Sequence, residues 1–139
     1  MKTLRYNNEI YPDYKIDENG DIFDAVKGRQ VAINYVCKSK ASPYARVSLR
    51  KPKGGRLTAL VHIAVCDTYN RHTLPRPEGV SVQEWEQTPQ SVKNFVRFSY
   101  QVNHIDHDQH NHHPSNLEYT TAKENQAAYQ KHRLTSESI

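Results

Sequence analysis

Residues 101–125 contain the side chains of this sequence that are best suited to chemistry. His104, Asn116 and Asn125 are separated by 12 and 9 residues, and Asn103 directly precedes the histidine. Histidine is the side chain whose unperturbed pKa lies closest to neutrality, so His104 can take up and release a proton at physiological pH. The stretch therefore predicts a site for acid–base chemistry.

The amino-acid sequence of this stretch resembles a known motif. Val102–Asp106 and Pro114–Asn125 are similar to the HNH motif of phage and intron-encoded homing endonucleases, in the variant whose third letter is asparagine. The resemblance implies that His104 is the general base that takes a proton from water. It also implies that Asn116 either holds the second ring nitrogen of that histidine or fixes the backbone of the loop.

The same resemblance implies a metal site that binds Mg²⁺, for which Mn²⁺ is expected to be able to substitute. Asn103 and Asn125 would each give a side-chain oxygen, and both are neutral, whereas other HNH proteins have a carboxylate at the first position. Two amide oxygens alone hold a hard cation weakly, so DNA phosphate oxygens are expected to complete the shell. Asp106 is the reserve carboxylate for metal or phosphate contact, because strand alternation would place it on the same face as His104.

Two segments upstream also resemble this family. Leu60–Tyr69 is similar to a helix that these enzymes share, with Ile63 in place of the usual arginine, and Tyr14–Ile22 is similar to their short N-terminal module. In the first segment, His62 is expected to be a buried, hydrogen-bonded residue rather than a second base.

The positive charge of the chain is concentrated in one region. The net charge is +4, yet the span from Ala25 to Cys66 contains nine lysines and arginines and no acidic residue. Such a run can be a solvated face, but its single sign over so long a span favours contact with the phosphates of double-stranded DNA. The residues expected to make these contacts are Lys38, Lys40, Arg46, Arg50, Lys51, Lys53 and Arg56.

The N-terminal half has the pattern of short strands separated by turns. Tyr14–Ile16 and Asp21–Phe23 flank Glu-Asn-Gly, a hairpin signal because asparagine and glycine tolerate positive φ. Tyr44–Leu49 alternates polar and apolar side chains, and the Lys-Gly-Gly-Arg turn leads it into Leu57–Val61. A short helix is expected over Ile63–Tyr69.

The C-terminal half predicts a helical insertion followed by a strand–loop–strand–helix unit. Residues 71–79 hold two prolines and one glycine and predict a loop. Two helices are expected after it: one begins at the Ser81 capping box and carries Trp85 in the core, and the next is capped by Thr88-Pro89 and has Val92, Phe95 and Val96 on one face. Two strands are expected next, Phe98–His104 and Leu117–Tyr119. A final helix is expected from the Thr121 capping box to about His132.

The predicted fold class is α+β, with a short-stranded β-rich N-terminal part followed by a C-terminal ββα-metal (His-Me finger) HNH nuclease unit. Residues 1–70 would form the basic DNA-binding part ending in a short helix, and residues 71–98 the proline-rich linker with the helical insertion. Residues 99–133 would form the nuclease unit, and residues 134–139 a tail.

Composition limits the environment and the partners. The 139 residues are 36% hydrophobic with a mean hydropathy of −0.89, no apolar run approaches the length of a membrane span, and the start lacks an apolar signal segment. Cys37 and Cys66 stand far apart and are expected to be free thiols in a reducing compartment. The chain is therefore expected in a cytoplasm, with no membrane and no obligate protein partner.

These features predict a metal-dependent DNA endonuclease that resembles the phage HNH homing endonucleases. The alternative is a DNA-binding protein that retains the fold and does not cut DNA. This alternative stays open because the two proposed metal ligands, Asn103 and Asn125, are both neutral. A third alternative is a transition-metal module, because imidazole suits Zn²⁺, Ni²⁺ and Cu²⁺. Its candidate ligands are the loop histidines His107, His110, His112 and His113, which are otherwise expected to lie near DNA.

Overall fold

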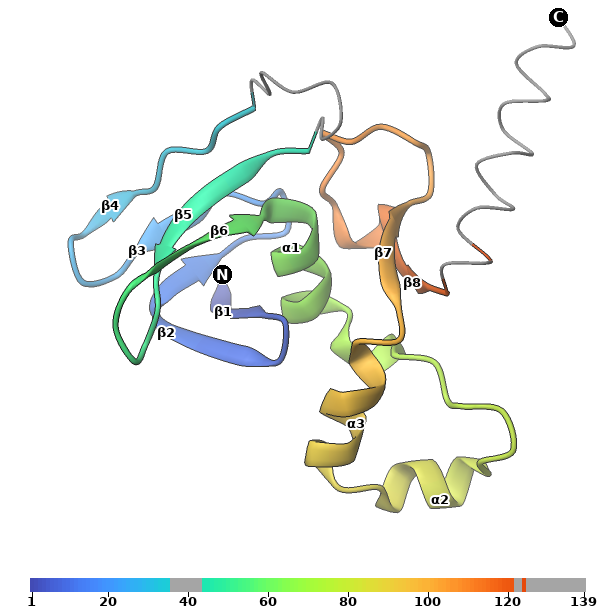
Figure 1. Cartoon of the computed structure of the whole chain (residues 1–139). Helices are drawn as coiled ribbons and strands as arrows, with labels where there is room; N and C mark the ends of the chain where they lie inside the picture. Colours follow the sequence, from blue (N-terminus) through green and yellow to red (C-terminus); the bar gives the residue numbers. More distant parts are fainter. Residues whose placement is uncertain (36–43, 122–123, 125–139) are drawn as a thin grey trace, which may run out of the picture.

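A four-stranded antiparallel sheet forms the N-terminal part of the computed structural model, which describes residues 1–35, 44–121 and 124. Its strands follow chain order: β1 (Lys2–Tyr6), β2 (Glu9–Ile16), β3 (Ile22–Asp24) and β4 (Arg29–Gln30) (Figure 1). The predicted β2–β3 hairpin is confirmed. The sequence patterns missed β1, which turns into β2 through Asn7 and Asn8, both at positive φ (47° and 74°).

The second predicted hairpin is also confirmed, as β5 (Arg46–Arg50) paired with β6 (Arg56–Leu60). Val47 and Leu49 point into the core between exposed or half-buried neighbours, as the alternation required. Gly54 and Gly55 both have positive φ at the turn, which L-residues rarely adopt. The hairpin therefore ends in a tight loop, and its tip carries lysine and arginine.

Helix α1 (Val61–Tyr69) directly follows β6 and contacts β1, β6, β7 and β8. Its residues Val61, Ala64, Val65 and Cys66 are fully buried. In Figure 1 the helix lies between the N-terminal strands on one side and the β7–β8 hairpin on the other. One helix thus joins the β-rich part to the segment that carries the histidines.

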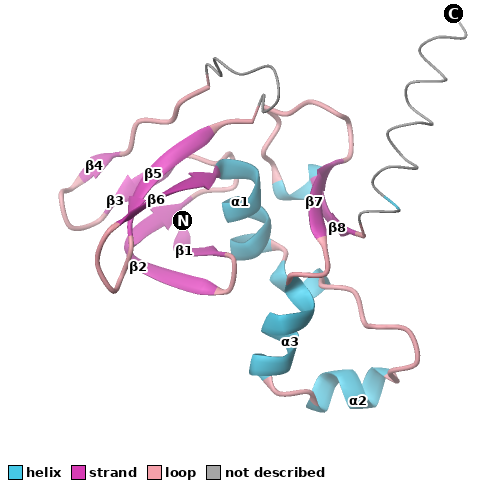
Figure 2. Cartoon of the chain, viewed as in Figure 1, coloured by secondary structure: helices cyan, strands magenta, loops and turns pink. Residues whose placement is uncertain are grey.

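Helices α2 (Val82–Gln87) and α3 (Gln90–Arg97) form an extension below this body, preceded by a 3₁₀ turn at Arg71–Thr73 (Figure 2). The Ser81 cap is confirmed, since its side chain accepts a hydrogen bond from the amide of Glu84. The predicted Thr88-Pro89 cap is wrong: Pro89 itself precedes α3, and the Thr88 hydroxyl donates to the carbonyl of Glu84 at 2.6 Å.

The side chains of this extension are only partly covered. Trp85 packs against the edge of the core and is half-buried, with the Lys93 ammonium 5.0 Å from its ring centre. Val92 and Phe95, on the predicted apolar face of α3, are 48% and 80% exposed. The insertion is therefore held mainly by its C-terminal end, where Arg97 enters the core.

A buried ion pair anchors that end. Arg97 Nε donates to Asp67 Oδ1 of α1 at 2.6 Å, and the hydroxyl of Tyr119 donates to the same oxygen at 2.6 Å. The backbone amide of Asn7 donates to the other oxygen at 2.8 Å. A single carboxylate thereby ties together the first sheet, α1, α3 and β8.

The last described elements are β7 (Gln101–His104), a 3₁₀ turn at Pro114–Asn116 and β8 (Leu117–Thr120). Thr121 and Glu124 form the predicted capping box, with the Glu124 amide and the Thr121 amide each bonded to the other's side chain at 3.1 Å. Glu124 is helical, and the rest of the predicted helix lies outside the described residues. Within the described part, no helix is long and apolar enough to cross a membrane.

Candidate active site

The loop between β7 and β8 is closed by Asn116. The amide of Ile105 donates to the carbonyl of Asn116 at 2.8 Å, and the amide of Asp106 donates to its side-chain oxygen at 2.9 Å. The side-chain nitrogen of Asn116 donates to Asn111 O at 3.0 Å and to Asp106 Oδ1 at 2.9 Å. Of the two roles that the sequence left open, the contacts match the second: Asn116 fixes the loop backbone.

Asp106 belongs to this internal bonding of the loop. Strand β7 ends at His104, so the expected alternation does not extend to Asp106, which lies in the turn that follows. Its carboxylate accepts hydrogen bonds from Asn111 Nδ2 at 2.8 Å, from Asn116 Nδ2 at 2.9 Å and from the amide of Asp108 at 2.8 Å. These donors, with Asn111 first, hold the pKa of the carboxyl below its usual range.

His104 is the last residue of β7 and is only 4% exposed. Three rings surround it, with centroids at 4.7 Å for His62, 5.8 Å for Tyr44 and 6.0 Å for His112. The Tyr44 ring is nearly parallel to it, at 10°. Nε2 of His104 is buried and has no hydrogen-bond partner among the described residues.

His62, from the first turn of α1, is the other histidine at the centre of this cluster. Its ring lies 4.6 Å from that of Tyr44 and 4.7 Å from that of His104. The residue is buried, as expected, but the expected hydrogen bond is not made at Nδ1, which has no partner within the described ranges. One local signal bears on this placement: the helix that carries His62 follows directly after the second strand of the hairpin.

Burial sets the protonation state of both rings. Desolvation, followed by the neighbouring His112, lowers the pKa of His104 to about 4. Desolvation, followed by the charge of His104, lowers the pKa of His62 to about 3. Both imidazoles are therefore neutral at physiological pH, and a general base must be in this form to accept a proton.

The other loop histidines have different hydrogen-bond partners, although His110 and His112 both contact the ring of Tyr35. His112 is buried, its Nε2 lies 3.1 Å from Gln109 O, and its ring packs on Gly20, where an added Cβ would lie 3.1 Å from His112 Nδ1. His110 contacts the ring of Tyr35, and His113 bonds Ser115. In the part of the chain that the structure describes, no three histidine, cysteine or acidic side chains converge on a common point. The transition-metal alternative therefore gains no support.

Of the two predicted metal ligands, one is described. Asn103 faces Glu118 across the β7–β8 pair, and its side-chain nitrogen donates to Glu118 Oε1 at 3.2 Å. Strand alternation places both on the face of the hairpin opposite His104, which pairs with Leu117. The contact engages the amide nitrogen, so the oxygen that a cation would bind is not used in it. Asn125 lies outside the described residues.

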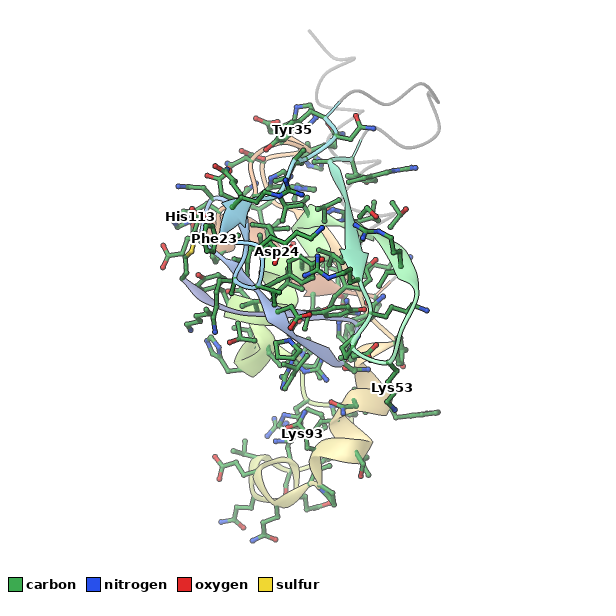
Figure 3. All side chains as sticks on the ribbon, turned by 90° about the vertical axis from the view of Figure 1, so that its left-hand side faces the viewer. Phe23, Asp24, Tyr35, Lys53, Lys93 and His113 are labelled. Atoms are coloured by element: carbon green, nitrogen blue, oxygen red, sulfur yellow. The ribbon has the colours of Figure 1, made fainter. Side chains whose placement is uncertain are left out.

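The basic residues of the hairpin differ in how far the fold engages them. Arg50 binds both carboxylate oxygens of Asp24, at 2.7 and 3.1 Å, which holds the pKa of that carboxyl well below its usual range. Arg56 Nε donates to Ser48 Oγ at 3.0 Å. Lys51 and Lys53 remain exposed, and Figure 3 shows Lys53 at the opposite edge of the molecule from His113.

Two more of the predicted DNA contacts, Lys38 and Lys40, lie outside the described residues, as does Cys37. Arg46 is half-buried, and its Nε has no partner among the described residues.

Cys66 is buried in α1, and burial, followed by the charge of Asp67, raises the pKa of its thiol to about 12. This is consistent with an inert core thiol.

The comparisons with known proteins fit this geometry. No protein-family model and no curated protein matches the chain. Among solved structures, it matches one titled "DNA binding and cleavage by the HNH homing endonuclease I-HmuI", with a TM-score of 0.59 at 18% identity. The match covers 98% of this chain and 60% of that one, so the chain spans about 60% of the length of the endonuclease. This chain therefore has the fold of an HNH homing endonuclease.

Proposed function

We propose that this protein is a metal-dependent endonuclease that hydrolyses phosphodiester bonds in double-stranded DNA. The observation that carries the proposal is the setting of His104. It ends a strand of an HNH-type fold, is neutral because it is desolvated, and is followed by a loop that Asn116 closes with four hydrogen bonds. A histidine in this setting is suited to take a proton from water.

The roles of the other residues follow from the same assignment. Asn116 keeps the loop in one conformation, so that the base at its start holds a fixed position. Asn103 and Asn125 would hold Mg²⁺ through their amide oxygens, a donor type that suits a hard cation. When bound, the cation neutralises charge on the phosphate and assists the departure of the leaving oxygen. The basic hairpin, with Lys51 and Lys53 exposed at its tip, would lie along the DNA backbone.

A nicking assay on supercoiled plasmid, with Mg²⁺ or Mn²⁺, tests the proposal. We expect the wild type to cut, and we expect His104→Ala to lose at least about 100-fold in rate, the usual scale of acid–base catalysis, while it binds DNA as before. His72→Ala, which removes an exposed histidine from the 3₁₀ turn after α1, is the matched control and should cut normally. Equal losses of binding and cutting in His104→Ala would assign the residue a structural role.

One observation favours a second candidate, a DNA-binding protein without cleavage. Both assigned metal ligands are neutral, and Asn103 is bonded to Glu118. A wild type that binds DNA and leaves it intact with either cation would establish this alternative.

Calorimetric titration of Mn²⁺ examines the metal site separately. The free protein should bind the ion weakly, and addition of an uncleavable DNA duplex should strengthen binding, because phosphate oxygens complete the shell. Asn103→Asp should bind the ion more tightly than the wild type, since a carboxylate replaces an amide. Asn125→Ala should lose the DNA-dependent binding, and tight binding that survives this change would place the metal elsewhere.

A further inference from the structure

Two buried ring nitrogens in the candidate site have no described partner, and they belong to neighbouring rings. They are Nε2 of His104 and Nδ1 of His62, whose ring centroids are 4.7 Å apart. A buried polar atom without a hydrogen bond is costly, so native structures rarely keep one without a reason. Here two such atoms lie in one contact between β7 and α1.

The residues that could otherwise orient His104 are engaged elsewhere. Asn116 uses its side-chain oxygen and nitrogen on the loop. His112 has Nε2 against Gln109 O, and the edge that carries its Nδ1 packs on Gly20. Tyr44 stacks on the face of the His104 ring, where it cannot bond an in-plane nitrogen. His62 is therefore the described residue left to set the orientation of His104.

We propose that His62 is a positioning residue for His104: Nε2–H of His104 donates through one bridging water molecule to Nδ1 of His62. A neutral imidazole carries one donor and one acceptor nitrogen, so the two unpartnered atoms are complementary. The hydrogen bond fixes the tautomer in which Nδ1 of His104 is unprotonated. Both residues are only 4% exposed, which excludes competing bulk water from the contact.

This inference rests on the proposed function for its catalytic consequence. Nδ1 of His104 takes a proton from water, and the oxygen of that water forms a bond to phosphorus as the phosphorus–oxygen bond to the leaving strand breaks. The leaving oxygen takes its proton from a second water. The positive charge that His104 gains is stabilised through the water molecule between its Nε2–H and His62, as an orienting partner does in other catalytic histidines.

Nitrogen-15 NMR of the histidine side chains tests the pairing without DNA or metal. In the wild type we expect His104 as the Nε2–H tautomer, assigned by loss of its signals in His104→Ala. His62→Phe keeps a ring in place and removes the acceptor, so His104 should become a mixture of tautomers. His62→Asn puts an oxygen near the position of Nδ1 and should restore the single tautomer, whereas His62→Gln, whose oxygen reaches further out, should not.

Cleavage rates provide the second readout. His62→Phe should lose about 10- to 100-fold, the usual effect of removing an orienting partner of a histidine, and His62→Asn should recover most of that loss. An Nδ1–H tautomer in the wild type overturns the proposal, as does a His104 tautomer that is the same in all four proteins. If His62→Phe does not fold, the Asn and Gln variants still decide. A wild type that fails to cut DNA refutes the proposed function and leaves the NMR result standing.

Discussion

Helix α1 carries two buried polar centres that are built in opposite ways. At its C-terminal end, the fully buried Asp67 carboxylate accepts hydrogen bonds from Arg97 and Tyr119, both at 2.6 Å. At its N-terminal end, His62 is almost as deeply buried beside His104, and one ring nitrogen of each has no described partner. Among the described residues, the Asp67 carboxylate at the first centre is completely hydrogen-bonded, although Arg71 Nη1, 3.9 Å from Oδ1, makes no hydrogen bond. The histidine pair at the second centre is incomplete.

The two centres therefore contribute differently to the stability of the fold. A buried carboxylate is tolerated only when it is paired and hydrogen-bonded, and the partners of Asp67 come from α3 and β8, so the pairing also fixes those elements. An unsatisfied polar atom gives no such stability. Such an atom calls for an explanation, and use by a proton or a water molecule is the one that the proposed site around His104 supplies.

The largest expected effect comes from breaking the complete centre. Asp67→Ala leaves the Arg97 guanidinium buried without its counter-charge, so the free energy of unfolding should fall by about 3–5 kcal/mol. Urea denaturation followed by circular dichroism measures this loss. Glu86→Ala, at an exposed carboxylate on α2, is the control and should change stability by less than about 0.5 kcal/mol. A loss below about 1 kcal/mol for Asp67→Ala would mean that the pair is not the anchor described here.

A smaller loss is expected from crowding the incomplete centre. Gly20 has a φ of +88°, and a Cβ there would lie 2.9 Å from Val61 Cγ1 and 3.1 Å from His112 Nδ1. Gly20→Ala should therefore destabilise the fold by more than the roughly 1–2 kcal/mol that positive φ alone costs. Gly79→Ala is a matched control, because Gly79 has a similar φ of +84° and open space around it. Equal losses of stability, measured by thermal denaturation, would show that the close contacts with Val61 and His112 are unimportant.

The pH dependence of the free energy of unfolding should distinguish the histidine centre from the Asp67 centre. Burial lowers the pKa of His62 to about 3 and that of His104 to about 4, so between pH 4 and 6.5 the unfolded chain binds protons that the folded chain does not. Stability should therefore be full above pH 6.5 and should decline as the pH falls below it. His62→Phe should reduce this slope by up to about 1.4 kcal/mol per pH unit.

Near neutral pH the same variant should be less stable than the wild type, because it leaves the buried Nε2–H of His104 without the acceptor proposed above. His72→Phe, at an exposed histidine, should leave the slope unchanged. Urea titrations at several pH values measure both quantities, and an unchanged slope in His62→Phe would contradict the buried, neutral state assigned to this ring.

The exposed charges of the hairpin should have almost no effect on stability. Lys51→Ala with Lys53→Ala should change the free energy of unfolding by less than about 0.5 kcal/mol. If both residues contact phosphates, the pair should reduce the slope of log affinity against log salt by about two. Lys93→Ala, on the helical extension shown in Figure 3, is the control. A slope that the double variant does not change would move the DNA interface elsewhere.

Local signals in the sequence predicted much of this architecture. The hairpins at Glu-Asn-Gly and Gly54-Gly55, the Ser81 and Thr121 caps, and the strand that ends at His104 all depend on residues within a few positions of one another. Two predictions from local patterns failed. Strand β1 was missed although Leu4 and Tyr6 alternate with Arg5, because so short an alternation is recognised only through its pairing with β2. The Thr88 cap failed because a second acceptor, the carbonyl of Glu84, competed for the hydroxyl.

The sequence by itself determined the residue types, the spacing of the HNH-like motif and the short elements, because each of these is encoded by neighbours along the chain. Tertiary structure decided which polar groups are satisfied. It paired Asp67 with Arg97, drew Arg50 to Asp24 and placed His62 against His104. Those outcomes depend on which side chains lose their water together when α1 packs between the sheets, and burial of that kind joins residues that no local pattern connects.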